Sequence, residues 1–253
     1  MVSTLGKCAA WSPPALRVNE VQVWSAGLDP EPADFDRFEE TLAPDERARA
    51  ARFYFPEDRR RFVTRRGLLR EMLGCYLGRE PHELRFATGP YGKPSLLYDS
   101  GPHEVHFNLA RSNNVAFYAF ARGRSVGIDV ERVNPDLAKQ RVAELFFSRR
   151  EFSALRALPE SFQVEAFFNY WTRKEAYVKA RGVGFFMSLD SFDVSLTPGE
   201  KAELLDGDER WSLHALTFVP GYAAAVAVQG TDCNLRLGTW RHDWAELHSG
   251  SPD

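Results

Sequence analysis

Hydrophobic residues recur at helical spacing along two long stretches of the chain and alternate with polar residues along several short ones. Phe62, Leu69 and Met72 lie on one helical face, which predicts a helix over about residues 56–76. A second long helix is expected over residues 161–180. Further helices are expected from residue 42, over 136–145 and over 148–158, and strands over 21–24, 84–87, 105–109, 115–121, 126–130, 191–196, 211–218 and 222–228. This mixture of helices and strands predicts an α+β fold.

The order of these elements indicates an internal duplication. Each half runs through helices into a long helix and then into antiparallel-looking strands, with residues 115–121 and 222–228 in matching places. We expect two similar α+β halves related by a pseudo-twofold, each a small antiparallel sheet with a long helix. The polar segment 122–125 marks the boundary, so the halves are residues 1–122 and 123–253. A ligand site is expected in the cleft between them.

The composition excludes several classes of protein. Of the 253 residues, 44% are hydrophobic and 26% are charged, as in ordinary soluble proteins. The longest apolar runs are too short to span a bilayer, and residues 1–11 contain no apolar stretch of signal-peptide length. The three cysteines form no CxxC pair, so a structural zinc site is not expected. We therefore expect a cytoplasmic protein with no membrane contact.

A local basic stripe contrasts with the net charge of −3. Nine arginines lie between Arg47 and Arg70. Nucleic-acid binding is one reading of such a stripe, but the acidic whole and the lack of stacking aromatic residues disfavour it. Most of these arginines are expected on solvated helix faces, and no nucleic-acid partner is predicted.

The first segment that carries chemistry is Gly127-Ile128-Asp129-Val130-Glu131. On a strand, Asp129 and Glu131 point to the same side while Ile128 and Val130 point to the core. Two neighbouring carboxylates repel each other, and a hard cation such as Mg²⁺ relieves that repulsion. The alternative is a solvated strand end, where Asp and Glu are common.

The second segment is the stretch 171–179, which carries a Trp-x-x-Lys-Glu-x-x-x-Lys pattern. On a helix, Trp171, Lys174, Glu175 and Lys179 lie near one face. The alternative is an exposed Glu175–Lys179 pair that stabilises the helix by a few tenths of a kcal/mol. Together with Asp129 and Glu131, however, Glu175 completes a set of three carboxylates beside two lysines. Such a set suits phosphoryl-type transfer, in which cations neutralise the phosphate and a carboxylate takes the proton of the nucleophile.

These two segments, in this order, resemble the paired signatures of the 4′-phosphopantetheinyl transferases. The length and the apparent duplication are similar to the larger, surfactin-synthetase-activating type. The resemblance covers most of residues 20–230 and includes 91–94, 107–109 and 220–222. It implies an enzyme that transfers 4′-phosphopantetheine from coenzyme A to a serine of an acyl or peptidyl carrier protein, with release of adenosine 3′,5′-bisphosphate.

The resemblance also implies roles for individual residues. Asp129, Glu131 and Glu175 would hold magnesium, with Glu175 as the base and Lys179 assisting departure of the bisphosphate. Contacts to coenzyme A are implied for Arg49, Lys93, Asn108, Arg111, Lys174 and Lys179. Since both halves of the cleft lie in one chain, we expect a monomer.

One departure from the family pattern follows Phe107-Asn108-Leu109. A Ser-His pair is usual there, whereas this chain has Ala110-Arg111. Arginine can still bind phosphate, even bidentately, so phosphate binding in an altered form is expected. The alternative is a non-catalytic module that binds coenzyme A or a carrier protein. The intact carboxylate trio, which a pure binder would not need, favours the enzyme.

Overall fold

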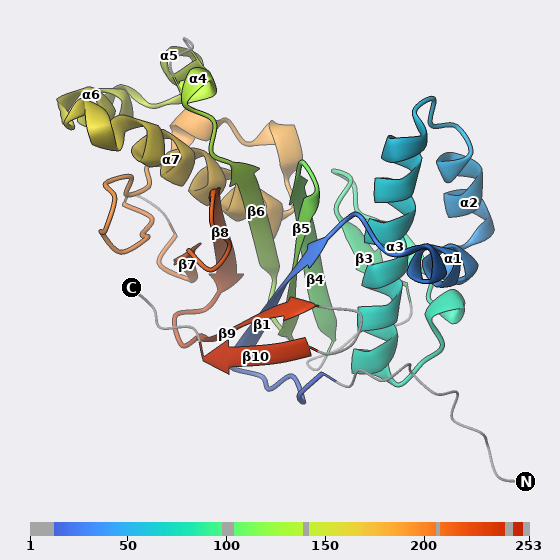
Figure 1. The fold of residues 1–253 in the computed structure, drawn as a ribbon. Helices are drawn as coiled ribbons and strands as arrows, with labels where there is room; N and C mark the ends of the chain where they lie inside the picture. Colours follow the sequence, from blue (N-terminus) through green and yellow to red (C-terminus); the bar gives the residue numbers. More distant parts are fainter. Residues whose placement is uncertain (1–12, 98–103, 139–141, 206–207, 241–244, 250–253) are drawn as a thin grey trace, which may run out of the picture.

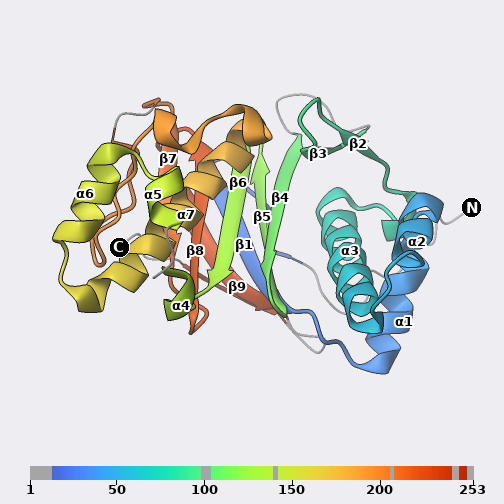
Figure 2. The same ribbon diagram turned by 90° about the horizontal axis from the view of Figure 1, so that it is seen from above.

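Two long helices cover the outer faces of two sheets that pack against each other (Figures 1 and 2). The computed structural model describes residues 13–97, 104–138, 142–205, 208–240 and 245–249. Hydrophobic side chains such as Val23 and Phe117 on one sheet meet Ile128 and Val226 on the other. These layers confirm the predicted α+β fold.

The first half contains one long helix and most of a five-stranded sheet. Its elements are β1 (Glu20–Gly27), α1 (Pro32–Thr41), α2 (Pro44–Ala50), α3 (Pro56–Leu77), the 3₁₀ turn η1 (Pro81–Glu83), β2 (Phe86–Thr88), β3 (Pro94–Leu96), β4 (Val105–Ser112) and β5 (Val115–Arg122). The sheet has the strand order β10-β9-β1-β5-β4, and β2 and β3 pair separately. The outer face of the sheet packs on α3.

The second half repeats this plan. Its elements are β6 (Val126–Arg132), α4 (Pro135–Ala138), α5 (Val142–Phe146), α6 (Arg149–Ala157), α7 (Glu160–Arg181), the 3₁₀ turns η2 (Gly184–Phe186) and η3 (Leu189–Ser191), β7 (Trp211–Leu216) and β8 (Tyr222–Gln229). The strand order β6-β8-β7 matches β1-β5-β4, because in each half the last strand lies between the other two. The antiparallel pairing within both sets confirms the predicted two-halves architecture.

The two long helices begin and end for local reasons that the sequence shows. Pro56 opens α3, and the acidic Glu57 and Asp58 that follow favour the positive end of the helix dipole. Gly78 and Gly182 end α3 and α7 in the left-handed conformation, with φ of 63° and 67°. Each helix is 22 residues long. Among the described helices, none combines the length and apolar character needed to cross a membrane.

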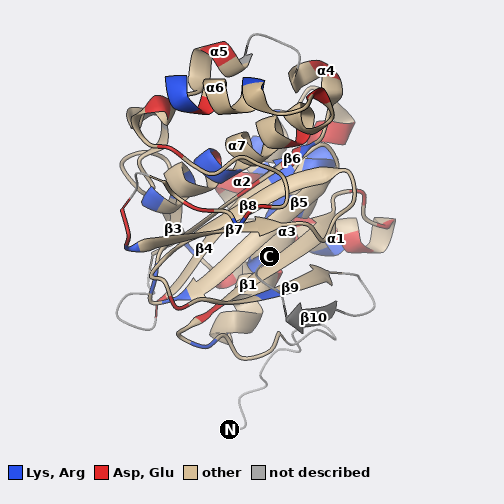
Figure 3. Ribbon diagram, turned by 90° about the vertical axis from the view of Figure 1, so that its left-hand side faces the viewer, with Lys and Arg blue, Asp and Glu red and all other residues tan. Residues whose placement is uncertain are grey.

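The helices before α7 lie over its outer side (Figure 3). In this view α6 carries both acidic and basic residues, whereas α4 and α5 carry only the acidic Asp136 and Glu144. The helix predicted over 136–145 is two short helices, α4 and α5, and residues 139–141 lie outside the described part. Helix α1 was not predicted.

The strand predicted over 191–196 is wrong for most of its length. Its first residue, Ser191, ends the 3₁₀ turn η3, and Val194 then forms a single bridge with Leu204. Backbone pairing is limited to two hydrogen bonds around this bridge, from the Ser195 N–H to Glu203 and from the Leu205 N–H to Asp193. Side chains hold the rest of the segment: Arg173 donates to the carbonyl of Ser195, and Glu151 accepts from the Val194 N–H.

Two further strands follow β8, where no strand was predicted. They are β9 (Asn234–Trp240) and β10 (Ala245–Ser249). Strand β9 pairs parallel with β1, and β10 pairs antiparallel with β9. They extend the sheet of the first half, although they follow the predicted boundary at 122/123, which itself stays a prediction.

Candidate active site

Strand β6 and helix α7 approach each other closely because Gly127 has no side chain. A Cβ atom at this position would lie 2.1 Å from the Ala180 nitrogen and 2.3 Å from the Ala176 oxygen. The contact brings the outer face of β6 against α7. It therefore places Asp129, two residues along the strand, beside the last turns of the helix.

Asp129 is the buried centre of a charged cluster. Its Oδ1 lies 2.5 Å from the Lys179 Nζ, and its side chain is 6% exposed. Its Oδ2 is buried and has no hydrogen-bond partner. Burial raises the pKa of Asp129 to about 7, the charges of Glu131 and Glu175 add to this rise, and Lys179 opposes it. A buried carboxylate oxygen without a partner is energetically costly and is suited to a cation.

The other two predicted carboxylates complete this cluster. Glu131 accepts a hydrogen bond of 2.8 Å from the Ser112 hydroxyl. Burial raises the pKa of Glu175, Lys179 lowers it, and the nearby charge of Glu131 raises it further. The structure thus brings Asp129, Glu131, Glu175 and Lys179 within electrostatic reach of one another. In the described part of the chain, no three acidic, histidine or cysteine side chains are already arranged around a metal position.

Several arginines form a second, basic cluster on the side of α3. Burial lowers the pKa of Arg65, and the positive charges of Arg111, Arg49 and Arg66 lower it further. Arg111 comes from β4, Arg49 from α2, and Arg65 and Arg66 from α3, so three elements converge on one basic patch. The aromatic face of Phe86 lies 4.0 Å from the Arg66 guanidinium carbon. Like charges gathered in this way favour a bound anion.

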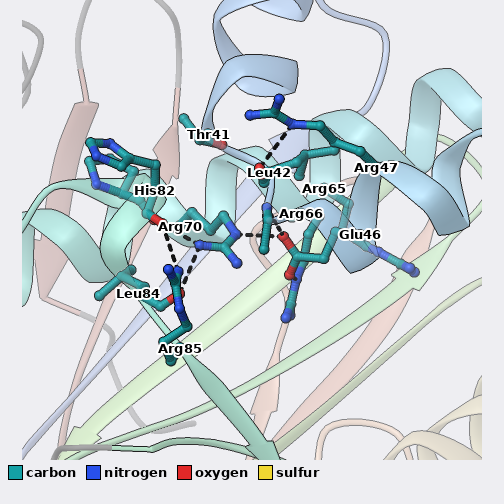
Figure 4. A network of polar contacts seen from close by, with 12 residues as sticks. Thr41, Leu42, Glu46, Arg47, Arg65, Arg66, Arg70, His82, Leu84 and Arg85 are labelled. Carbon is teal, nitrogen blue, oxygen red and sulfur yellow. Dashed lines mark hydrogen bonds and ion pairs between the residues drawn. The ribbon is translucent and has the colours of Figure 1, made fainter.

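Arg65 and Arg66 belong to this basic cluster, although the sequence did not single them out from the other arginines. They lie within the stripe of nine arginines, whose members have very different surroundings. Figure 4 shows Arg66 reaching Glu46 together with Arg70. Arg47, from the same stripe, instead donates to the carbonyl of Leu42. Charge pattern alone therefore could not separate the clustered arginines from the others.

Two predicted coenzyme contacts, Lys93 and Asn108, connect the two halves. The Lys93 Nζ donates to the carbonyls of Val126 and Ala180 at 2.9 Å each, and burial lowers the pKa of Lys93 to about 8. Asn108 Oδ1 accepts from the Ile128 N–H at 2.9 Å. Lys93 lines a cavity of about 250 Å³ that has residues of both halves in its wall. Its remaining N–H leaves it able to contact a ligand.

The structure separates Lys174 from the site, contrary to the prediction. Its side chain is 0% exposed, and its Nζ donates to Glu151 and to the carbonyls of Leu189 and Phe192. Glu175 and Lys179 are only partly buried, on a different face of α7. Lys174 therefore has no free N–H and no path to a phosphate.

Comparison with known proteins identifies the family. The sequence model of the 4′-phosphopantetheinyl transferase superfamily matches residues 125–227, and that of the 4′-phosphopantetheinyl transferase N-terminal region matches residues 26–122. The 4′-phosphopantetheinyl transferase HetI of Nostoc sp. is 42% identical over 220 residues, which cover 86% of this chain and 92% of HetI. The chain belongs to the 4′-phosphopantetheinyl transferase superfamily.

Other relatives agree with this membership. The 4′-phosphopantetheinyl transferase Sfp of Bacillus subtilis is 31% identical over 199 residues, covering 78% of this chain and 86% of Sfp. This phosphopantetheinyl transferase is therefore an enzyme of the Sfp-like type. The alternative of a non-catalytic binding module is not favoured.

Proposed function

We propose that this phosphopantetheinyl transferase moves 4′-phosphopantetheine from coenzyme A to a serine of an acyl or peptidyl carrier protein through the Asp129 cluster. The observation that carries the proposal is the buried Asp129 Oδ2 without a partner, beside two further carboxylates and Lys179. We further propose that the enzyme acts as a monomer, because one chain supplies both charged clusters, and that it is cytoplasmic, as its composition predicts.

The basic cluster is the proposed site for the phosphates at the nucleotide end of coenzyme A. Arg111 is exposed on β4 and lies in the same basic patch as Arg49 and Arg65. Guanidinium groups match phosphate oxygens with paired hydrogen bonds. Arg111 thus supplies a phosphate contact where the family usually has histidine. Lys93 and Asn108 would contact the coenzyme from the junction between the halves.

The carboxylate cluster fits a divalent cation. Asp129, Glu131 and Glu175 provide hard oxygen donors of the kind that Mg²⁺ prefers, and the partnerless Asp129 Oδ2 is one of them. When bound, Mg²⁺ would neutralise negative charge on the pyrophosphate of coenzyme A. Lys179 is 32% exposed in its side chain and is able to turn from Asp129 toward a phosphate.

The proposed transfer is a substitution at the phosphorus attached to the pantetheine oxygen. The serine Oγ forms a bond to this phosphorus while the bond to the bridging pyrophosphate oxygen breaks. That oxygen leaves with the electron pair as adenosine 3′,5′-bisphosphate, and Lys179 stabilises its charge. Glu175 takes the serine proton, directly or through a water molecule.

The test is mass spectrometry of an apo carrier protein incubated with the enzyme, coenzyme A and Mg²⁺. The wild-type chain should add the mass of one phosphopantetheine group to the carrier serine. Asp129→Asn and Glu175→Gln should each lower kcat by about two to three orders of magnitude, because each removes a charge that acts in the transition state. Glu160→Gln, an exposed carboxylate on the same helix, is the matched control and should keep wild-type rates.

Two results would refute different parts of the proposal. Wild-type rates in both Asp129→Asn and Glu175→Gln would show that the cluster is not the catalytic centre. Full activity after removal of all divalent metal would refute the role of Mg²⁺ and leave the transfer itself intact.

A further inference from the structure

Two buried ion pairs occupy equivalent places in the two halves of the molecule. In the first half the Arg70 Nε lies 2.7 Å from the Glu46 Oε2, and in the second half the Lys174 Nζ lies 2.7 Å from the Glu151 Oε2. The exposed side-chain fractions are 1% and 7% for the first pair and 0% and 2% for the second. Charges this deeply buried are tolerated only when hydrogen bonds satisfy both partners.

The four residues also occupy the same positions within their helices. Glu46 and Glu151 are each the third residue of a short helix and accept from the backbone N–H just before it, at 2.9 and 3.0 Å. Arg70 and Lys174 stand at the same position, counted from the first residue, of the 22-residue helices α3 and α7. The duplication has therefore kept one arrangement with two different cations.

Each cation also holds the segment that follows its long helix. Arg70 donates to the carbonyls of Pro81 and Leu84, at 2.8 and 3.1 Å, as part of the network in Figure 4. Lys174 donates in the same way to the carbonyls of Leu189 and Phe192. Each pair thus ties together a short helix, a long helix and the chain after it. This is an architectural role, and it is the same in both halves.

In the second half the buried Glu151–Lys174 pair lies next to the proposed active site. All three N–H bonds of Lys174 are used by Glu151 and the two carbonyls, so none remains for a phosphate. Successive residues of an α-helix differ by about 100° in direction. Fixing the direction of Lys174 therefore fixes the direction of its neighbour Glu175, and that of Lys179 one turn later.

We infer that Glu151 and Lys174 are positioning residues of the transferase, whose buried pair sets the rotation of α7 and holds Glu175 and Lys179 opposite Asp129. This inference rests on the proposed function of the Asp129 cluster. It assigns Lys174 an indirect role in catalysis instead of the predicted contact to a phosphate. A reacting group displaced by about 1 Å can lose about a hundredfold in rate, so loosening the pair should lower kcat.

The experiment compares Lys174→Met with Arg70→Met, the equivalent change in the first half. Carrier-protein transfer provides kcat, and calorimetry at low and high salt provides the dissociation constant of coenzyme A. For Lys174→Met we expect kcat to fall by about tenfold or more, with the dissociation constant and its salt dependence unchanged within about twofold. Arg70→Met should lose a similar amount of thermal stability and keep its kcat.

Opposite results would overturn the inference. If Lys174 contacts a phosphate instead, Lys174→Met should weaken coenzyme A binding and reduce its salt dependence. If Lys174 only stabilises the fold, Lys174→Met should leave kcat unchanged below the unfolding temperature. If Lys174→Met does not fold, the double variant Glu151→Gln/Lys174→Met decides, because it leaves no unpaired buried charge. Inactivity of the wild-type chain in the same assay would refute the proposed function, whereas full kcat in the variants would refute the inference alone.

Discussion

Glu71, on α3, is a carboxyl group whose charge lowers the stability of the folded protein at neutral and alkaline pH. Its side chain is 16% exposed, and its Oε1 lies 2.8 Å from the Arg37 Nε. Burial raises the pKa of Glu71 from 4.5 to about 7, the negative charge of Asp34 adds to the rise, and Arg37 opposes it. Glu71 belongs to neither charged cluster of the proposed site, so its replacement reports on folding alone.

The size and sign of the effect follow from this shift. A pKa raised from 4.5 to about 7 in the folded state corresponds to about 3 kcal/mol of differential stability. Between these two values the folded protein holds a proton that the unfolded chain has lost. The contribution of Glu71 to the free energy of unfolding is therefore complete below pH 4.5, falls as the pH rises to 7, and stays low above pH 7.

The assay is urea unfolding of the wild type and of Glu71→Gln at several pH values between 5 and 8. The glutamine cannot ionise, so the variant should gain about 2–3 kcal/mol relative to the wild type between the two ends of this range. Any constant cost of losing the Arg37 contact cancels, because only the change with pH is compared. A stability difference that stays the same within about 0.5 kcal/mol from pH 5 to pH 8 would refute the reasoning.

Two further predictions concern the phosphate cluster and the contact of β6 with α7. Arg111→Ala should raise the dissociation constant of coenzyme A by about tenfold, because it removes a charged hydrogen-bond donor. Arg111→Lys keeps the charge and should raise the dissociation constant less. Equal affinities of Arg111→Ala and wild type in calorimetry would contradict this prediction. Gly127→Ala should lower the free energy of unfolding by about 1–3 kcal/mol or more, because its Cβ would overlap the backbone of Ala176 and Ala180. Gly27→Ala, with no atom within 4 Å of its Cβ, is the control. Equal urea midpoints for the two variants would contradict the prediction, because they would show that α7 can move away from β6 without loss of stability.

Much of the carboxylate cluster could be predicted because each part depends on local periodicity. Alternation along β6 places Asp129 and Glu131 on one side, and helical spacing places Glu175 and Lys179 on one face of α7. The approach of these two elements depended on the resemblance to a known family. Their convergence through Gly127 became visible only in the structure.

Lys174 shows where local periodicity fails. Helical spacing puts it near the face of Glu175 and Lys179, but the choice between core and site depends on what α7 packs against. Lys174 lies in the core because it pairs with the buried carboxylate of Glu151, 23 residues earlier in the sequence. The failed strand at 191–196 has the same origin, since its backbone is held by the side chains of α7 and by Glu151. Long-range partners of this kind leave no mark in a local pattern.

The parallel pairing of β9 with β1 affects how the molecule folds as it is synthesised. Strand β1 emerges early, yet one of its two neighbours in the sheet comes from residues beyond 230, so its edge stays unpaired until almost all of the described chain has been made. Unpaired strand edges readily join wrong partners. A nascent chain of this kind depends on its late segment to protect its early one, so we expect that the two halves do not fold independently in spite of their shared plan.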